Sequence, residues 1–186
     1  MDLSTSAVVF LFLIYHLCEA GDRSYNSVLI VANGGEWGEW GKIESCPSGH
    51  AYGFSLKTEM IPQGYTSDDT ALNGIRLHCS SGAVVLPCPW LSCRKKQQHH
   101  TESGRSAFAL KVEAPQGPGD DTAANNIQFK CEDGTVLEGE STDFGTYGHW
   151  SKRCSTGAIC GIQTKVEAIT SVDTTGLNDV KFFCCD

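Results

Sequence analysis

Two pairs of adjacent aspartates are the residues of this sequence whose chemistry is easiest to name. Asp68-Asp69 opens the stretch DDTALNGIRLHC, and Asp120-Asp121 opens DDTAANNIQFKC. Paired carboxylates can act as acid and base or nucleophile where their surroundings separate their pKa values, as in glycoside hydrolysis. They can also supply oxygen ligands for calcium. A structural role competes with both, because short Asp side chains before a strand accept backbone N–H groups in turns.

A third and weaker copy of the same stretch, DTTGLNDVKFFC, begins with Asp173-Thr174. The three copies recur with a period of about 53 residues, which is typical of a repeat architecture. Because the motif follows this period and tolerates the loss of one carboxylate, a structural turn is favoured over glycan binding, and glycan binding over catalysis. Asn73, Asn125 and Asn178 recur inside the copies, and we expect them to serve the same kind of turn.

Three of the four tryptophans stand in glycine-rich stretches and are a second candidate for ligand binding. Trp37 and Trp40 belong to WGEW, and Trp150 ends YGHW, which begins with Tyr147. The two tetrapeptides align in the repeats, so that Trp37 matches Tyr147 and Trp40 matches Trp150. Aromatic side chains beside glycine can stack on sugar rings, or they can close the end of a small domain. The structural role is favoured, and glycan binding by these tryptophans and the aspartate pairs is the alternative.

Motifs of the common enzyme classes are absent from the sequence. It contains no Gly-x-Ser-x-Gly elbow, no His-Glu-x-x-His, no P-loop and no dinucleotide fingerprint. His50, His78 and His149 are scattered, without a nucleophile at a recognisable spacing. We therefore predict a protein that is not an enzyme and needs no cofactor, with a glycan-active enzyme as a minor alternative.

One interval, residues 86–106, matches neither sister copy and offers a metal-like pattern. Cys88, Cys93, His99 and His100 have spacings that loosely suit tetrahedral zinc. Secreted cysteines near an unpaired cysteine are more often disulfides, so we predict no metal site. The interval is either a diverged surface loop or an error in the gene model, and the second is slightly favoured because both flanks stay in register.

A repeated pair of strands carries these candidate residues. The first strand of each copy reads FSLKTE (54–59), FALKVE (108–113) and IQTKVE (162–167). Apolar or short residues alternate with polar or charged ones, so one face of each strand is expected to be buried and the other wet. The residues expected to face inward at the start of each strand are Phe54, Phe108 and Ile162. Those expected to face solvent beside them are Ser55, Ala109 and Gln163.

The second strand of each copy alternates in the same way and ends at Cys79, Cys131 or Cys184. After residue 20 no segment shows a helical apolar period longer than two turns. Each unit of about 53 residues has room for about four short strands, and three units are too few for propeller blades. The sequence therefore predicts an all-β fold of three small sheets around a pseudo-threefold axis, with a β-trefoil as the runner-up.

Several longer motifs resemble one known family, the vitelline membrane outer layer protein 1 family. They are NGGEWGEWG (33–41), CPSGHAYGFSLKTE (46–59), GDDTAANNIQF (119–129), WSKRC (150–154) and FFCCD (182–186). The likeness covers about residues 28–186 apart from the interval described above. It implies a β-prism I fold, in which three Greek-key sheets form the sides of a prism with their apolar faces inward. It also implies secretion and residence in the outer coat of an egg.

Repeat symmetry narrows the pairing of the cysteines. Cys46 and Cys79 stand in the first copy where Cys154 and Cys184 stand in the third, so we predict a Cys46–Cys79 disulfide. In the third copy, Cys154 and Cys160 should pair with Cys184 and Cys185, in an order that the sequence leaves open. The predicted partner of Cys131 is Cys88 or Cys93, which leaves one free thiol. Each such disulfide stabilises by roughly 2–4 kcal/mol.

The N-terminus of the chain resembles a secretory signal. A short apolar run is followed by small residues at the expected cleavage point, so we predict that residues 1–20 are removed and that residues 21–186 form one domain. The repeats span about 28–80, 81–132 and 133–186. The remaining 14 basic and 20 acidic residues give a net charge of −6, which argues against nucleic acid or an anionic membrane as partner. No later run is long enough to insert in a membrane.

These observations predict a secreted, disulfide-stabilised structural protein of an extracellular coat or secretion, which associates with extracellular glycoproteins or glycans. The alternative is a lectin-like or carbohydrate-active module that binds oligosaccharides of the N-acetylglucosamine type. The tissue, the individual partner and the oligomeric state are not specified by the sequence.

Overall fold

A computed structural model describes residues 23–58, 72–85, 99–100, 107–114, 123–168 and 176–186, and of His99 and His100 the backbone alone. Six long strands pair as three antiparallel hairpins. They are β4 (Ala51–Thr58) with β5 (Leu72–Cys79), β8 (Ala107–Val112) with β9 (Ala124–Lys130), and β12 (Ala158–Val166) with β13 (Leu177–Cys185). Within these residues no helix is long and apolar enough to cross a membrane.

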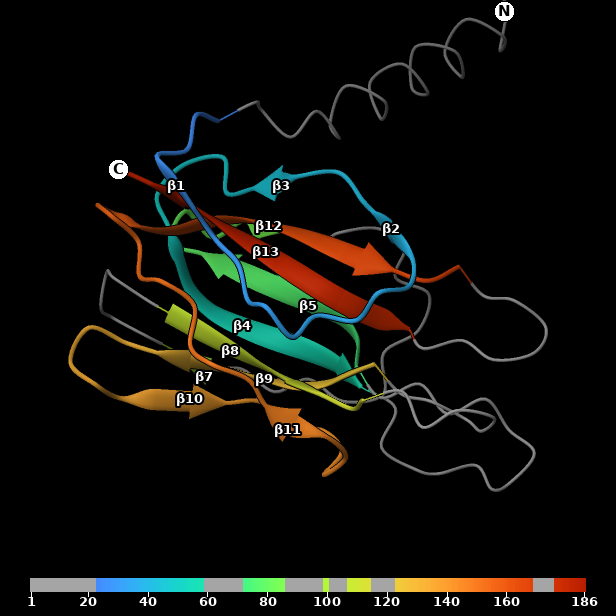
Figure 1. The fold of residues 1–186 in the computed structure, drawn as a ribbon. Helices are drawn as coiled ribbons and strands as arrows, with labels where there is room; N and C mark the ends of the chain where they lie inside the picture. The colour runs from blue at the N-terminus through green and yellow to red at the C-terminus, as the bar shows by residue number, and fades with distance from the viewer. Residues whose placement is uncertain (1–22, 59–71, 86–98, 101–106, 115–122, 169–175) are drawn as a thin grey trace, which may run out of the picture.

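Short outer strands extend each hairpin into a sheet. These strands are β1 (Ser27–Leu29), β2 (Glu39–Trp40), β3 (Glu44–Ser45), β6 (Val84–Val85), β7 (His99–His100), β10 (Val136–Glu138) and β11 (Thr146–Tyr147). Sheet I has the order β6-β5-β4-β7, sheet II has β10-β9-β8-β11, and sheet III has β1-β13-β12-β2 with β3 also on β12 (Figure 1). The all-β fold of three sheets is therefore confirmed.

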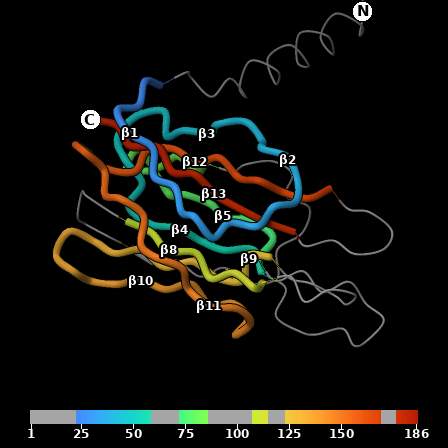
Figure 2. Tube along the Cα trace, in the orientation of Figure 1, coloured from blue at the N-terminus to red at the C-terminus, as the bar shows by residue number. Residues whose placement is uncertain are grey.

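Sheets I and II share one connection pattern. Three consecutive strands lie side by side, and the fourth returns to the far side of the first, which is a Greek key. In sheet III the chain ends after β13, and the N-terminal strands β1 and β2 take the two outer places (Figure 2). Each sheet thus joins the hairpin of one sequence repeat to outer strands of the next repeat, and sheet III closes the cycle between the two ends of the chain.

The three hairpins meet in one apolar core. Residues at the same register position of each hairpin form its central layer: Phe54 with Leu77, Phe108 with Phe129, and Ile162 with Phe182. All six side chains are buried. Ring centroids lie 4.7 Å apart between Phe54 and Phe129, and 4.8 Å apart between Phe108 and Phe182, so that rings from different sheets touch. Because each buried aromatic ring removes a large apolar area from water, this layer is a main source of stability.

The expectation that the opposite face of each first strand is wet was wrong at two positions. Ser55 and Ala109 are buried although they point away from the core. The Ser55 hydroxyl lies 2.8 Å from Nε2 of His78 on the neighbouring strand. Ala109 lies on the outer face of sheet II, and a hydrogen bond from the Tyr147 hydroxyl to Glu138 joins the two edge strands of that sheet. The alternation of apolar and polar residues along a strand does not reveal which outward-facing residues are buried by side chains from elsewhere in the sequence.

Three disulfides join described residues, and they match the predicted pairings. They are Cys46–Cys79, Cys154–Cys184 and Cys160–Cys185. Adjacent cysteines on β13 point to opposite faces, so Cys184 and Cys185 bond to different partners. Cys131 is a buried, free thiol within the described part of the chain. Its predicted partners, Cys88 and Cys93, lie outside the described residues, so that pairing stays a prediction.

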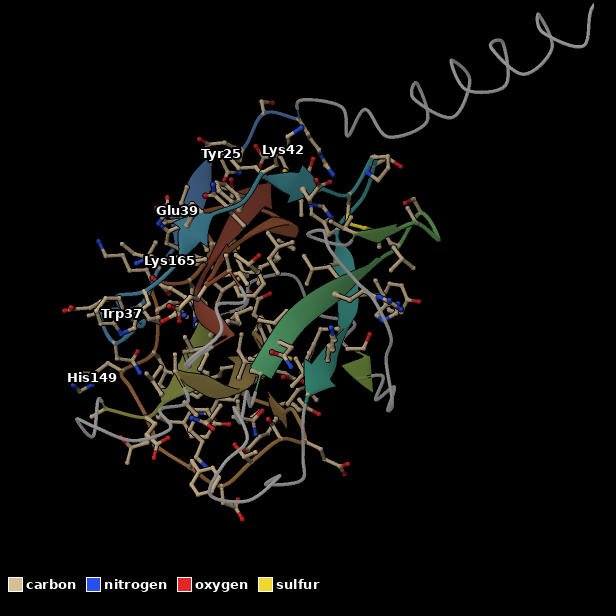
Figure 3. All side chains as sticks on the ribbon, turned by 90° about the vertical axis from the view of Figure 1, so that its right-hand side faces the viewer. Tyr25, Trp37, Glu39, Lys42, His149 and Lys165 are labelled. Carbon is tan, nitrogen blue, oxygen red and sulfur yellow. A yellow bond between two sulfur atoms is a disulfide. The ribbon has the colours of Figure 1, made fainter. Side chains whose placement is uncertain are left out.

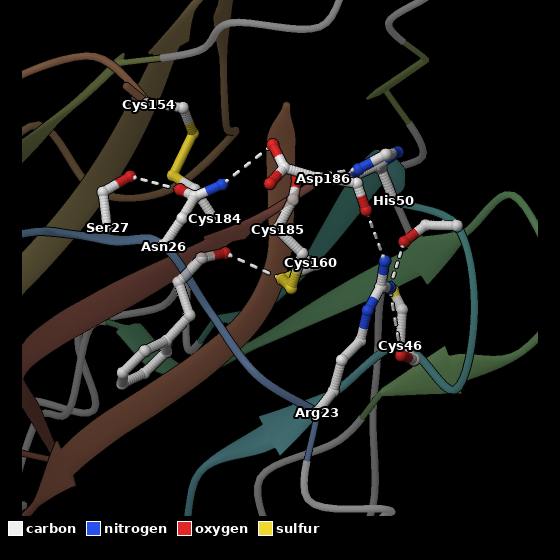
Figure 4. The surroundings of a disulfide bond; sticks show 12 residues. Arg23, Asn26, Ser27, Cys46, His50, Cys154, Cys160, Cys184, Cys185 and Asp186 are labelled. Atoms are coloured by element: carbon white, nitrogen blue, oxygen red, sulfur yellow. Dashed lines mark hydrogen bonds between the residues drawn. A yellow bond between two sulfur atoms is a disulfide. The ribbon is translucent and has the colours of Figure 1, made fainter. Parts of the chain in front are cut away.

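Side chains from the start of the described chain hold its C-terminus (Figure 4). Arg23 donates from Nη2 to the carbonyl oxygen of Asp186 at 3.1 Å, and from Nη1 to that of Gly49. Asn26 donates to the Asp186 carboxylate at 3.1 Å, and Nε2 of His50 lies 2.9 Å from the carbonyl oxygen of Cys185. The first described residues and the C-terminus are therefore fixed together beside the Cys160–Cys185 disulfide.

Candidate functional site

The predicted site residues fall into two groups. Both aspartate pairs lie outside the described residues, so their role as turns or ligands stays a prediction. These residues are Asp68, Asp69, Asp120 and Asp121. The three tryptophans are described, and the structure places Trp37 and Trp40 along sheet III and Trp150 next to sheet II.

The asparagines of the repeated motif lie in β-bulges rather than in turns. The strand register shifts at the same place in each hairpin, and the residue skipped there is Asn73, Asn125 or Asn178. Asn125 and Asn178 are fully buried, and each donates from Nδ2 to the carbonyl oxygen two residues earlier at 3.3 Å. The repeated asparagine therefore ties the bulge to the backbone, as expected for an extra residue inside a ladder.

Trp40 is a structural residue of sheet III. It pairs with Lys165 in the register, and Nζ of Lys181 lies 3.8 Å from the centroid of its ring. A cation at this distance covers one face of the indole. The available surface of Trp40 is correspondingly small.

The residue equivalent to Trp40 is Tyr147, which corrects the alignment made from the sequence. Tyr147 pairs with Lys111 as Trp40 pairs with Lys165, and these lysines are repeat equivalents. Gly38 and Gly145 precede these strands at matching places, and both have positive φ, of 85° and 76°. Sequence alignment placed Trp37 on Tyr147 because both tetrapeptides contain aromatic and glycine residues, and was three residues out of register.

Tyr147 spans the outer face of sheet II. Its hydroxyl donates to Oε1 of Glu138 at 2.8 Å, and these residues lie on the two opposite edge strands, β11 and β10. Burial, together with this carboxylate, raises the pKa of Tyr147 far above its ordinary value. In sheet III the corresponding polar link is absent from the described contacts, because Ile30 occupies the edge position that Glu138 has in sheet II.

Trp37 lies in a loop, 33–37, whose backbone is held by sheet III. Its side chain is 59% exposed. The Gly35 N–H donates to the Asn178 carbonyl oxygen at 2.7 Å, and Lys165 donates from Nζ to the carbonyl oxygen of Glu36 at 2.6 Å. The exposed indole therefore stands on a fixed support, which lowers the entropy lost when a ligand binds.

Asn33 connects this loop to sheet II. Its Nδ2 donates to the Leu110 carbonyl oxygen at 2.9 Å. The backbone of Gly148 approaches so closely that a Cβ there would lie 2.4 Å from Oδ1 of Asn33, so that only glycine fits. Oδ1 of Asn33 is buried and has no hydrogen-bond partner. An acceptor left without a donor costs free energy unless a ligand or water supplies one.

A carboxyl group lies beneath the same loop. Asp179 is held against Gly34, and burial raises the pKa of its carboxyl above the ordinary value, although the Val180 N–H and the lysines 165 and 181 act in the opposite direction. Trp37 and His149 lie on the same side of the molecule as Lys165 (Figure 3). His149 follows Gly148 in the sequence and is exposed.

Two observations bear on the predictions about catalysis and metal binding. Ser55 and His78 form a nucleophile–base contact that the sequence analysis missed, because the two residues are 23 positions apart and meet only through strand pairing. Both are buried. No group of metal ligands occurs among the described residues. Cys88 and Cys93 of the predicted metal-like pattern lie outside them, as do the side chains of His99 and His100.

Comparison with known proteins identifies the family. A family model described as "Vitelline membrane outer layer protein I (VOMI)" matches residues 27–186. The chain belongs to the vitelline membrane outer layer protein I family. A Homo sapiens relative named "Vitelline membrane outer layer protein 1 homolog" is 45% identical over 175 residues, which cover 89% of this chain and 86% of the relative. A Mus musculus relative of the same name is 44% identical over 171 residues, covering 87% and 84%.

Two solved structures resemble the fold of this chain. This VOMI-family chain is similar to a mannose-specific jacalin-related lectin from Morus nigra in complex with mannose, with a TM-score of 0.53 and 14% identity over 89% of this chain and 98% of the lectin. It is also similar to artocarpin in a mannotriose complex, with a TM-score of 0.52 and 12% identity over 88% and 99%. These likenesses confirm the β-prism fold.

The sequence analysis found Trp37 but missed its surroundings. Asn33, Lys165, Asp179 and Gly148 come from three distant parts of the chain, and only strand pairing brings them together. The one signal for this arrangement was the Asn-Gly-Gly run before Trp37, since glycine permits close backbone approach.

Proposed function

We propose that this protein is a secreted, disulfide-stabilised structural component of an extracellular coat, in which it associates with glycoproteins. Membership of the vitelline membrane outer layer family over residues 27–186 carries this proposal. Three disulfides support it, because such bonds persist in oxidising, extracellular compartments. We assign no enzymatic activity, since the family and the structural neighbours carry the names of coat proteins and lectins.

A second candidate function is that of a lectin-like module for oligosaccharides of the N-acetylglucosamine type. The exposed and rigidly supported indole of Trp37 favours it. The β-prism neighbours bind mannose or mannotriose, and shared fold gives this candidate an analogy rather than a site.

The experiment for the first function uses the full chain expressed in animal cells. We expect the protein in the culture medium, oxidised at its disulfides, and retained on a layer of immobilised egg-coat glycoproteins. Serum albumin, immobilised at the same density, is the control layer. Retention inside the cells, or equal retention on both layers, would contradict the proposal.

The same layer separates the two functions. If the coat protein contacts polypeptide, binding survives enzymatic removal of the glycans, whereas a lectin loses its binding. Asp68→Asn and Asp120→Asn then test the aspartate pairs. The structural-turn prediction expects a lower melting temperature with unchanged binding of N-acetylglucosamine oligomers, and loss of binding at full stability would assign the pairs to a glycan site.

A further inference from the structure

We propose that Trp37 is a modification site, at which one mannose is attached through a carbon–carbon bond to Cδ1 of the indole. The inference rests on the proposed secretion, because the transferases for this reaction act in the secretory pathway. In the reaction, Cδ1 of the indole bonds to C1 of a mannose that is activated as a polyprenyl phosphate. The bond from C1 to the phosphate oxygen breaks, the polyprenyl phosphate leaves, and the hydrogen of Cδ1 is lost as a proton.

Trp37 and Trp40 form the pattern that directs this reaction. Tryptophan C-mannosyltransferases recognise Trp-x-x-Trp in a chain that has not yet folded, and they modify the first tryptophan. The tetrapeptide WGEW (37–40) has this spacing, whereas neither Trp90 nor Trp150 is followed by a tryptophan three positions later. A pattern of four residues is informative only where the structural context fits it, so the environment of each tryptophan decides.

The folded structure leaves room for a sugar on Trp37. This residue is 59% exposed and lies at the periphery of the molecule (Figure 3). Among the described residues, no aromatic ring or cation packs on its indole. A mannose on this side chain therefore does not have to displace a packed ring or an ammonium group.

The other described tryptophans have different environments. Trp40 belongs to β2 and pairs with Lys165 in the register, and Nζ of Lys181 lies 3.8 Å from the centroid of its ring. Trp150 is 38% exposed, and Nζ of Lys130 lies 5.8 Å from its ring centroid. The tryptophan that the pattern selects for modification is therefore also the one that stays open after folding.

The backbone on both sides of Trp37 is fixed to sheet III. Lys165 donates from Nζ to the carbonyl oxygen of Glu36 at 2.6 Å. Gly38 has a φ of 85°, and a Cβ on it would lie 2.4 Å from the carbonyl carbon of Val166, so its backbone lies directly against that strand. Because both neighbours are held in this way, the side chain between them stays exposed, and a sugar attached to it lies on the surface.

The modification would change the properties of this surface. An exposed indole is a large apolar group, and a covalently attached sugar is bulky, polar and solubilising. A substituted indole is also less available for stacking on a free sugar. Modification of Trp37 therefore favours the coat function over the lectin-like function.

The test is mass spectrometry of the full chain after its secretion by animal cells and digestion with trypsin. We expect the peptide that contains Trp37 to carry the added mass of one anhydrohexose, with fragment ions that place it on this residue. The added mass should survive alkaline β-elimination and peptide N-glycosidase, because neither treatment breaks a carbon–carbon bond. The peptide that contains Trp150 should have its unmodified mass.

Trp40→Tyr is the variant that tests the pattern. It removes the second tryptophan and keeps an aromatic ring at the position where Tyr147 stands in sheet II. We expect Trp37 to lose its modification in this variant, whereas the control Glu39→Gln, which changes a residue inside the pattern, should keep it. Because the reaction precedes folding, the same peptide is also measured in extracts of the cells, so that poor folding of a variant does not obscure the result.

Unmodified Trp37 in the secreted wild type would overturn the inference, as would equal modification of the wild type and Trp40→Tyr. Removal of the added mass by β-elimination would overturn it too, since the sugar would then be attached to a hydroxyl group. If egg-coat glycoproteins retain the secreted chain while Trp37 is unmodified, the inference fails and the coat function stands. If Trp37 is modified but the glycoproteins do not retain the chain, the inference stands and the coat function fails.

Discussion

At the scale of single residues, environment rather than residue type separates the candidates. Trp40 and Trp37 stand three positions apart, but one lies under a lysine and the other is open to solvent. Asp179 provides a similar contrast with Asp133. Burial raises the pKa of Asp179, whereas hydrogen bonds from Thr135 lower the pKa of Asp133. The two carboxyl groups therefore affect stability with opposite dependence on pH.

Asp179→Asn tests this at the residue scale. As pH rises above 3.8, the ordinary value, the unfolded chain loses the Asp179 proton before the folded protein does, so the wild type loses stability through the interval up to its raised pKa. The variant lacks this loss and still accepts the Val180 N–H. Its free energy of unfolding, measured by denaturant titration, should therefore gain on the wild type as pH rises, and then stay level.

The control for this prediction is Asp133→Asn, for which the trend is reversed. A lowered pKa gives stability that is present above 3.8 and lost on acidification, so this variant should fall behind the wild type as pH rises. Parallel curves for the two variants would refute the assignment of opposite shifts.

At the scale of elements, the outer strands distinguish otherwise similar sheets. Sheet II is crossed by the Tyr147–Glu138 hydrogen bond, and Ala109 on the same sheet is buried. Sheet III has Trp40 in the place of Tyr147 and the exposed Ile30 at the opposite edge. The same architecture therefore presents a closed polar surface on one side and a more apolar one on another.

Tyr147→Phe measures the value of this crossing. The aromatic ring is kept, while the hydroxyl bond to Glu138 is lost, so we expect a decrease of about 0.5–1.5 kcal/mol in the free energy of unfolding. Tyr25→Phe is a fair control because Tyr25 is half exposed and its ring contact with Phe183 survives the change. Equal losses in both variants, measured by urea unfolding, would show that the crossing contributes nothing specific.

Elements were predictable from the sequence where a local period determines them. The alternation at Phe54 and its equivalents identified the central strands, and the repeat placed Cys46 opposite Cys79. The buried Ser55 and the Ser55–His78 contact were not predictable, because they depend on neighbours far along the chain. The surface around Trp37 was missed for the same reason: Asn33 and Gly148 are 115 positions apart in the sequence.

At the scale of the whole molecule, the fold is a cycle of three Greek-key sheets. The first and the last strands of the described chain both lie in sheet III. β1 pairs with β13, and Arg23 holds the carbonyl group of Asp186. The unit that repeats in the sequence is thus displaced from the unit that forms a sheet. Nothing in the pairing of the strands requires the ends to be where they are.

A circular permutant tests this description. A short linker joins Asp186 to Arg23, and the new ends are opened between the exposed residues Pro47 and Ser48. Because all described strands and the Cys46–Cys79 bond are kept, we expect the same disulfides as in the natural chain by mass spectrometry and an unchanged circular dichroism spectrum. Opening β5 between Asn73 and Gly74 cuts a central hairpin and should abolish cooperative unfolding. Failure of the first permutant would show that the natural order of strands matters.

The pairing of β1 with β13 also determines when sheet III can form during synthesis. The ribosome synthesises β1 first and its partner β13 last. The β4–β5 and β8–β9 hairpins can therefore form while sheet III still lacks its central strands, β12 and β13. Throughout that interval Val28 and Leu29 have no strand to cover them, and Cys184 and Cys185 have not yet emerged to be oxidised. The newborn chain should depend on chaperones and disulfide exchange catalysts until β13 has left the ribosome.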